Sequence, residues 1–77
     1  MPRFYFHLRD GDTYEEDTDG IELPDVDSAQ TEAVVAAREI LAEQITLGIP
    51  IGDQMVEVTD EQGFIVFKLP FRNILHS

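Results

Sequence analysis

Residues 25–50 read DVDSAQTEAVVAAREILAEQITLGIP and predict one long helix. At about 100° per residue, the apolar side chains of this segment fall on one wide stripe, which is the pattern of a helix packed against a core. Four of the side chains on the stripe are alanines, whose small size lets a helix sit close to a sheet. The stripe consists of Val26, Ala29, Ala33, Ala36, Ala37, Ile40, Leu41 and Leu47.

Both ends of this helix carry termination signals. Asp27 and Gln30 have the spacing of a capping box, in which a side-chain acceptor covers free backbone amides. Gly48 follows the last apolar residue and is a natural C-cap, and Pro50 prevents the helix from continuing. Val35 lies in the middle of the polar face, so we expect it to be exposed.

The segment before the helix predicts a strand over 3–9, because its apolar residues alternate with a period of two. A three-residue loop at 10–12 sets Leu8 opposite Tyr14 in a short second strand. A further extended piece covers 21–23 and ends at Pro24. The expected core-facing residues of the first strand are Phe4, Phe6 and Leu8, and its outward-facing residues are Tyr5, His7 and Arg9.

The segment after the helix predicts a hairpin, with strands at 55–59 and 64–69 and a turn at 60–63. A four-residue turn places Val58 opposite Ile65 and Val56 opposite Phe67, which leaves Glu57 on the outer face. The expected fold is therefore an α+β domain in ββαββ order, with one helix packed on an antiparallel sheet. The 77 residues fit one domain.

The charge of the chain is strongly negative and unevenly distributed. Sixteen acidic and five basic residues give a net charge of −11, which argues against nucleic-acid binding, because phosphate contacts need clustered lysines and arginines. No apolar run is long enough to span a bilayer and no export signal is visible, so we expect a cytoplasmic protein that does not bind membranes. We define the acidic window as nine carboxylates without an intervening base: Asp10, Asp12, Glu15, Glu16, Asp17, Asp19, Glu22, Asp25 and Asp27.

The sequence offers little chemistry for catalysis. There is no cysteine, neither serine lies in a nucleophile turn, and no glycine-rich loop is present, so we expect neither an enzyme nor a cofactor. Glu15, Asp17 and Asp19 alternate before Gly20 as in the first half of an EF-hand loop, but Val26 occupies the position of the bidentate glutamate. Weak divalent-cation binding is therefore an alternative, and a solvated acidic hairpin is the preferred interpretation. We expect His7 to be a surface histidine beside a neighbouring acid.

Protein interaction is the remaining class of function. The hypothesis is a non-enzymatic interaction module that self-associates and docks a basic protein, with an antitoxin-like inhibitor of a basic protein as the alternative. The apolar tail after Pro70 either caps its own core or buries against a second copy, and we expect the second copy, because a small domain gains most from borrowed apolar surface. The candidate contact residues are Glu15, Glu16, Asp17, Asp19, Val35, Phe71, Ile74 and Leu75.

Several segments together resemble a known family. They are residues 1–11 (MPRFYFHLRDG), residues 19–25 (DGIELPD), Glu32-Ala33, residues 36–39 (AARE) and residues 69–72 (LPFR). The chain resembles a family of short, acidic, uncharacterised alpha-proteobacterial proteins that are frequent in rhizobia and are classed as a domain of unknown function. The resemblance implies no ligand, activity or catalytic residue. Residues 19–25 before an alanine-rich helix are also similar to HicB-type antitoxins, although no DNA-binding region is present.

Overall fold

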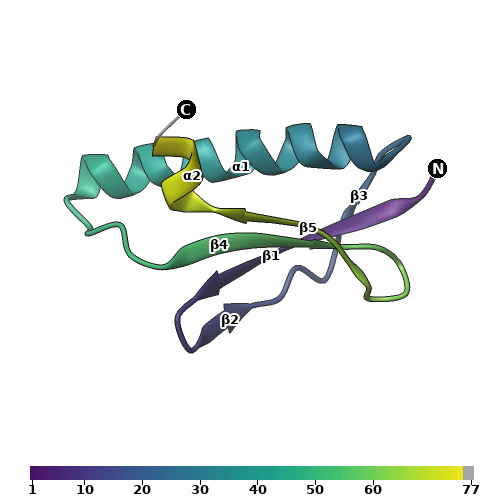
Figure 1. Cartoon of the computed structure of the whole chain (residues 1–77), viewed down its shortest axis with the longest axis horizontal. Helices are drawn as coiled ribbons and strands as arrows, with labels where there is room; N and C mark the ends of the chain where they lie inside the picture. The colour runs from purple at the N-terminus through teal and green to yellow at the C-terminus, as the bar shows by residue number, and fades with distance from the viewer. Residues whose placement is uncertain (76–77) are drawn as a thin grey trace.

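A computed structural model describes residues 1–75 of the chain. Four strands form an antiparallel sheet in the order β2-β1-β4-β5, and a short additional strand, β3, pairs with the other end of β1. The long helix α1 lies across one face of this sheet (Figure 1). The elements are β1 (Arg3–Asp10), β2 (Thr13–Glu15), β3 (Ile21–Glu22), α1 (Val26–Leu47), β4 (Gln54–Thr59), β5 (Ile65–Pro70) and α2 (Phe71–Leu75). The predicted α+β class is confirmed, and the extended piece at 21–23 supplies a third strand before the helix.

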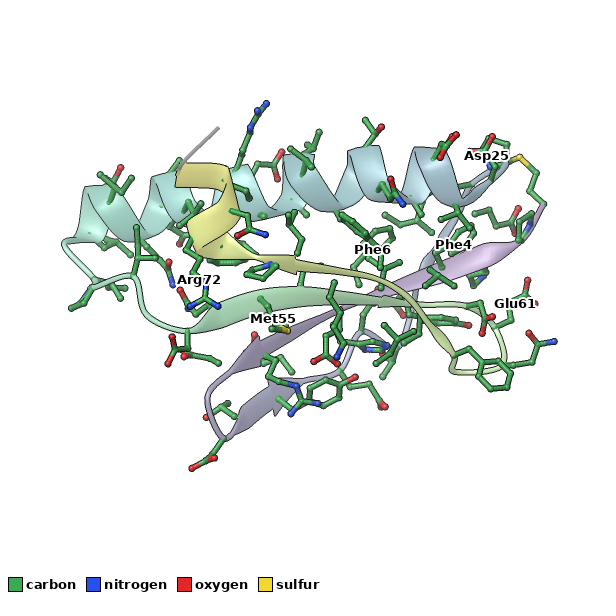
Figure 2. All side chains as sticks on the ribbon, viewed as in Figure 1. Phe4, Phe6, Asp25, Met55, Glu61 and Arg72 are labelled. Atoms are coloured by element: carbon green, nitrogen blue, oxygen red, sulfur yellow. The ribbon has the colours of Figure 1, made fainter. Side chains whose placement is uncertain are left out.

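The alanine stripe explains how α1 sits on the sheet. Ala29, Ala33 and Ala37 are fully buried, so the helix backbone approaches the sheet closely. The strands contribute larger side chains to the same core, and Figure 2 shows Phe4 and Phe6 between β1 and α1. The predicted stripe is too long at its ends, because Val26 and Leu47 are 39% and 63% exposed.

The two ends of α1 differ in how well they match the prediction. The N-cap is Asp25 rather than Asp27, since the Asp25 carboxylate accepts the backbone N–H of Ser28 at 2.8 Å. Asp25 has extended backbone angles, as a cap residue requires, whereas Asp27 already lies in the first turn of the helix. The predicted C-cap is confirmed: Gly48 adopts the left-handed conformation, with φ of 71°, and its N–H donates to carbonyl groups of the last turn.

The registers of both hairpins differ from the prediction. In the first hairpin Leu8 lies opposite Glu15 and Arg9 opposite Tyr14, so the loop has two residues and Tyr14 leaves the core face. The guanidinium of Arg9 lies over the Tyr14 ring, 4.6 Å from its centroid, and this contact favours the observed register.

In the second hairpin Val58 lies opposite Phe67 and Val56 opposite Leu69, which is a shift of two residues from the prediction. The Asp60 carboxylate accepts the backbone N–H groups of Gln62 and Phe64, which holds the turn, and a bulge follows it. An even shift keeps Phe67 and Leu69 on the core face. The bulge instead moves Ile65 opposite Thr59, where it is 49% exposed.

The C-terminal tail folds onto its own domain. The side chain of Phe71 is fully buried in the core, and Ile74 packs against the same core from α2. The expectation that Phe71 buries against a second copy is therefore wrong, because the thin core of a small domain uses this ring itself. The side chain of Leu75 lies outside the part of the chain that the structure describes. Within residues 1–75, no helix is both long enough and apolar enough to cross a membrane.

Candidate functional site

The candidate site lies where the middle of β1 has no strand partner on one side. One end of β1 pairs with β3 and the other with β2, so between them the backbone of β1 has no strand partner on that side. The loop that joins β2 to β3 covers this gap through Asp17. Its carboxylate accepts the backbone N–H of Phe6 at 3.1 Å, and also those of Asp19 and Gly20 at 3.1 and 3.2 Å. Asp17 therefore takes the place of a missing strand residue.

These hydrogen bonds also set the charge state of Asp17. Burial raises the pKa of its carboxyl group, but the backbone N–H donors of Phe6, Gly20 and Asp19 lower it by more, so the pKa lies below its ordinary value. Asp17 is consequently a fixed anion whose oxygen atoms are already occupied by protein donors.

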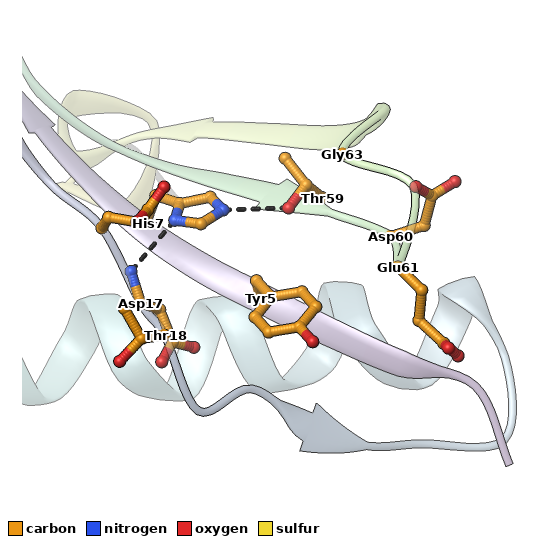
Figure 3. Close-up of a pocket in the computed structure, with 9 residues that line it drawn as sticks. Tyr5, His7, Asp17, Thr18, Thr59, Asp60, Glu61 and Gly63 are labelled. Atoms are coloured by element: carbon orange, nitrogen blue, oxygen red, sulfur yellow. Dashed lines mark hydrogen bonds between the residues drawn. The ribbon is translucent and has the colours of Figure 1, made fainter.

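His7 holds the same loop through the backbone of Asp17 rather than through its carboxylate. The backbone N–H of Asp17 donates to His7 Nδ1 at 3.0 Å, and His7 Nε2 lies 2.9 Å from Thr59 Oγ1 (Figure 3). His7 is only 7% exposed, so the prediction of a surface histidine is wrong. The residue is buried because the loop from β2 to β3 covers this part of the outer face.

The contacts of His7 determine its tautomer. A backbone amide can only donate, so Nδ1 must be the unprotonated nitrogen and Nε2 must carry the proton. A histidine acting as general base in a nucleophilic triad has the opposite arrangement, with Nδ1–H donating to a carboxylate and Nε2 accepting from the hydroxyl group. The series Asp17, His7 and Thr59 therefore does not have the arrangement of such a triad, and His7 in this tautomer donates to Thr59 rather than deprotonating it.

An internal ion pair lies on the outer face beyond His7. Arg9 Nε lies 2.6 Å from Glu57 Oε2, and the hydrogen bond to Glu57 raises the pKa of Arg9 above its ordinary value. Burial raises the pKa of the neighbouring Tyr14. Glu57 is only 5% exposed, although it was predicted to lie outside, because Arg9 and the outer-face side chains cover it. Arg9 is therefore not free to neutralise the acidic window.

Two hollows flank the loop that contains Glu16 and Asp17. The first, here called the Tyr5 pocket, has a volume of about 340 Å³ and lies on the outer face beside Tyr5 and His7 (Figure 3). The carboxylate residues that line it come from two loops far apart in the sequence. Its lining residues are Tyr5, His7, Glu16, Asp17, Thr18, Thr59, Asp60, Glu61 and Gly63.

The second hollow, here called the Ile40 groove, lies toward α1 and has a volume of about 570 Å³. Its floor is apolar and comes from β1 and α1, and its rim is acidic. The floor consists of Phe6, Leu8 and Ile40, and the rim consists of Glu15, Glu16 and Asp17. No lysine or arginine is among the described residues that line either hollow.

The structure brings together only some of the predicted contact residues. Glu16 and Asp17 line both hollows and Glu15 lines the Ile40 groove, whereas Val35 is exposed on α1 and lines neither. Asp19 is exposed, and its backbone carbonyl accepts a hydrogen bond from the Arg3 guanidinium at 2.9 Å. Among residues 1–75, no group of three histidine, cysteine or acidic residues is arranged to hold a metal ion.

Sequence reasoning missed the residues that other segments contribute to the hollows. Tyr5, Asp60 and Glu61 reach the Tyr5 pocket because β4 pairs directly with β1, which brings the 60–63 turn to the same side. Ile40 was predicted as a core residue but is only half-buried and forms part of the groove floor. The alternation within a strand predicts its faces, but it carries no signal for which strand lies beside it.

The chain matches a known family model over most of its length. The model described as Domain of unknown function (DUF6894) matches residues 3–72. The chain belongs to the DUF6894 family. No curated protein and no solved structure matches it. The resemblance to a domain of unknown function is thus confirmed, and the DUF6894 match runs from β1 into α2 and includes every residue that lines the two hollows.

Proposed function

We propose that this DUF6894 domain is a non-enzymatic interaction module that binds a basic protein at the segment Glu15–Asp17. The observation that supports this most directly is the position of Glu16 and Asp17, which line both the Tyr5 pocket and the Ile40 groove. Carboxylates beside hollows, without a lysine or arginine in the described lining, create a local negative potential that attracts a basic surface. An antitoxin-like inhibitor covering a basic enzyme belongs to the same class.

The basic residues nearest in sequence to the acidic window are already engaged. Arg3 pairs with Glu22 at 2.9 Å, and Arg9 pairs with Glu57 at 2.6 Å. In the described part of the chain, neither ion pair involves Glu15 or Glu16. The charges of Glu15 and Glu16 are therefore available to a partner, and removing them should not disturb a bond that the fold needs.

Capture experiments with matched variants test this function. The double variant Glu15→Gln/Glu16→Gln removes two charges beside the hollows, whereas Glu39→Gln/Glu43→Gln removes two exposed charges from α1 that line neither hollow. We expect the wild-type domain and the α1 control to retain the same basic proteins from native lysate at low salt, and the Glu15/Glu16 variant to lose them. Equal capture by all three proteins would contradict the proposal.

Self-association is a second candidate function, and exposed apolar side chains near the end of α1 favour it. Ile45, Leu47 and Ile49 are exposed at the C-terminal end of α1 and just beyond it. Large exposed apolar side chains concentrated at one end of a domain are typical of protein contacts. Sedimentation across a range of concentrations tests this: Ile45→Ser/Leu47→Ser should be monomeric where the wild type dimerises, and a wild type that remains monomeric throughout would refute it.

A further inference from the structure

We infer that the Ile40 groove receives an amphipathic helix of the basic partner, with apolar side chains in the groove and lysines or arginines against its rim. This inference rests on the proposed function and names the structural element of the partner. It starts from the combination of an apolar floor and an acidic rim in one groove. A purely polar partner would leave the floor uncovered, and an apolar partner without charge would desolvate the rim carboxylates.

The groove exists because β2 is too short to cover its side of β1. β2 ends at Glu15, and the chain then crosses to β3 through the loop that Asp17 holds. Phe6 and Leu8 face the core side of the sheet, yet both remain only partly buried, as does Ile40 of α1. The floor is thus an exposed margin of the hydrophobic core, and covering it with apolar side chains would bury surface that the isolated domain leaves in water.

A helix fits this position better than an added strand. An added strand needs unpaired N–H and C=O groups at a sheet edge. Beside the groove, Leu8 is paired with β2, and the N–H of Phe6 donates to Asp17. The adjoining part of β1 therefore lacks the free backbone groups that a new strand would pair with. A groove between a helix and a sheet instead suits the apolar face of a helix, whose side chains recur at intervals of three and four residues.

The charge of the groove also favours a basic partner over a second copy of this chain. A second copy brings a net charge of −11 to an acidic rim, so its approach is opposed by repulsion. A partner with a basic flank replaces this repulsion by attraction, and its association should be faster at low salt.

Two synthetic peptides of identical leucine and lysine composition test the inference. One places leucines at i, i+3, i+4 and i+7, and the other alternates leucine with lysine. We expect the helix-patterned peptide to bind at least about tenfold more tightly, since burial of one large apolar side chain is sufficient for that ratio. In spectra of the isotope-labelled domain, its binding should shift the methyl signals of Leu8 and Ile40. Ile40→Ala should weaken this peptide selectively, and the wild-type methyl shifts provide a readout that needs no variant.

The possible outcomes separate the inference from the proposed function. Equal binding of the two peptides, lost in Glu15→Gln/Glu16→Gln but without methyl shifts at Leu8 and Ile40, would overturn the helix inference and leave the basic-partner function in place. Failure of both peptides to bind, or undiminished binding by the Glu15/Glu16 variant, would overturn both.

Discussion

The carboxylate of Asp17 accepts the backbone N–H of Phe6 at 3.1 Å, in the gap between the two short strands that pair with β1. This contact divides the acidic window by role. Asp17 is a structural anion with three backbone donors, whereas Glu15 and Glu16 line the Ile40 groove without an ion-pair partner in the described chain.

Asp17→Asn should destabilise the domain by about 1–3 kcal/mol, because it removes a charged acceptor of several backbone hydrogen bonds. Asp19→Asn is the matched control, since Asp19 is exposed and contributes its backbone rather than its carboxylate to these contacts. Urea unfolding of both variants gives the comparison. Equal stabilities of the two variants would show that Asp17 does not hold the loop.

The contribution of Asp17 should disappear in acid. Its pKa is lower in the folded state than in the unfolded chain, where an aspartate has a pKa of about 3.9. The stabilisation is therefore complete above that pH and is lost as the pH falls through the folded-state pKa. The difference in unfolding free energy between wild type and Asp17→Asn should be constant near neutral pH and shrink below about pH 4. A difference that is the same at pH 3 and pH 7 would contradict this account.

Gly20→Ala should cost at least about 1 kcal/mol more than Gly11→Ala. Both glycines have positive φ, of 70° and 59°, so both substitutions strain the backbone. A Cβ at Gly20 would also lie 2.9 Å from Arg3 Cγ, Phe4 O and Tyr5 Cε2, whereas one at Gly11 would meet nothing within 4 Å. Thermal unfolding of the two variants measures the difference. Similar melting temperatures would mean that the loop does not lie this close to β1.

The stability of the domain should rise as neutral salt is increased from a low concentration. The nine carboxylates of the acidic window repel one another, and ions screen exposed charges over about 10 Å at ordinary ionic strength. Glu15→Gln/Glu16→Gln should be at least as stable as wild type at low salt, with a smaller response to added salt. A clear loss of stability in this variant would reveal bonds of Glu15 or Glu16 that support the fold.

The fold class and the long helix could be predicted because their signals are local. The spacing of Ala29, Ala33 and Ala37 marks the buried face, and Gly48 marks the end of the helix. The two hairpin registers could not, because each depends on a side-chain contact that alternation does not encode. Arg9 over Tyr14 accompanies the first register, and the Asp60 carboxylate holds the turn before the bulge in the second.

Only part of the candidate site could be predicted from the sequence. Glu15, Glu16 and Asp17 were identified from charge alone, but their different roles depend on the gap between β2 and β3. The alternation of β1 predicts correctly that His7 lies on the outer face. It does not predict the loop that covers this residue, and for that reason the expected surface position is wrong. Long-range strand pairing decides these features, and one sequence does not specify it.

The salt dependence of binding to the helix-patterned leucine–lysine peptide tests the central claim most directly. The dissociation constant is measured over a range of salt concentrations for the wild type, Glu15→Gln/Glu16→Gln and the control Glu39→Gln/Glu43→Gln. If a basic partner docks at Glu15–Asp17, binding should weaken with salt in the wild type and the control, and the Glu15/Glu16 variant should show weaker binding with a shallower salt dependence. The same affinity and the same salt dependence in all three proteins would contradict the claim, because the acidic rim would then play no part in recognition.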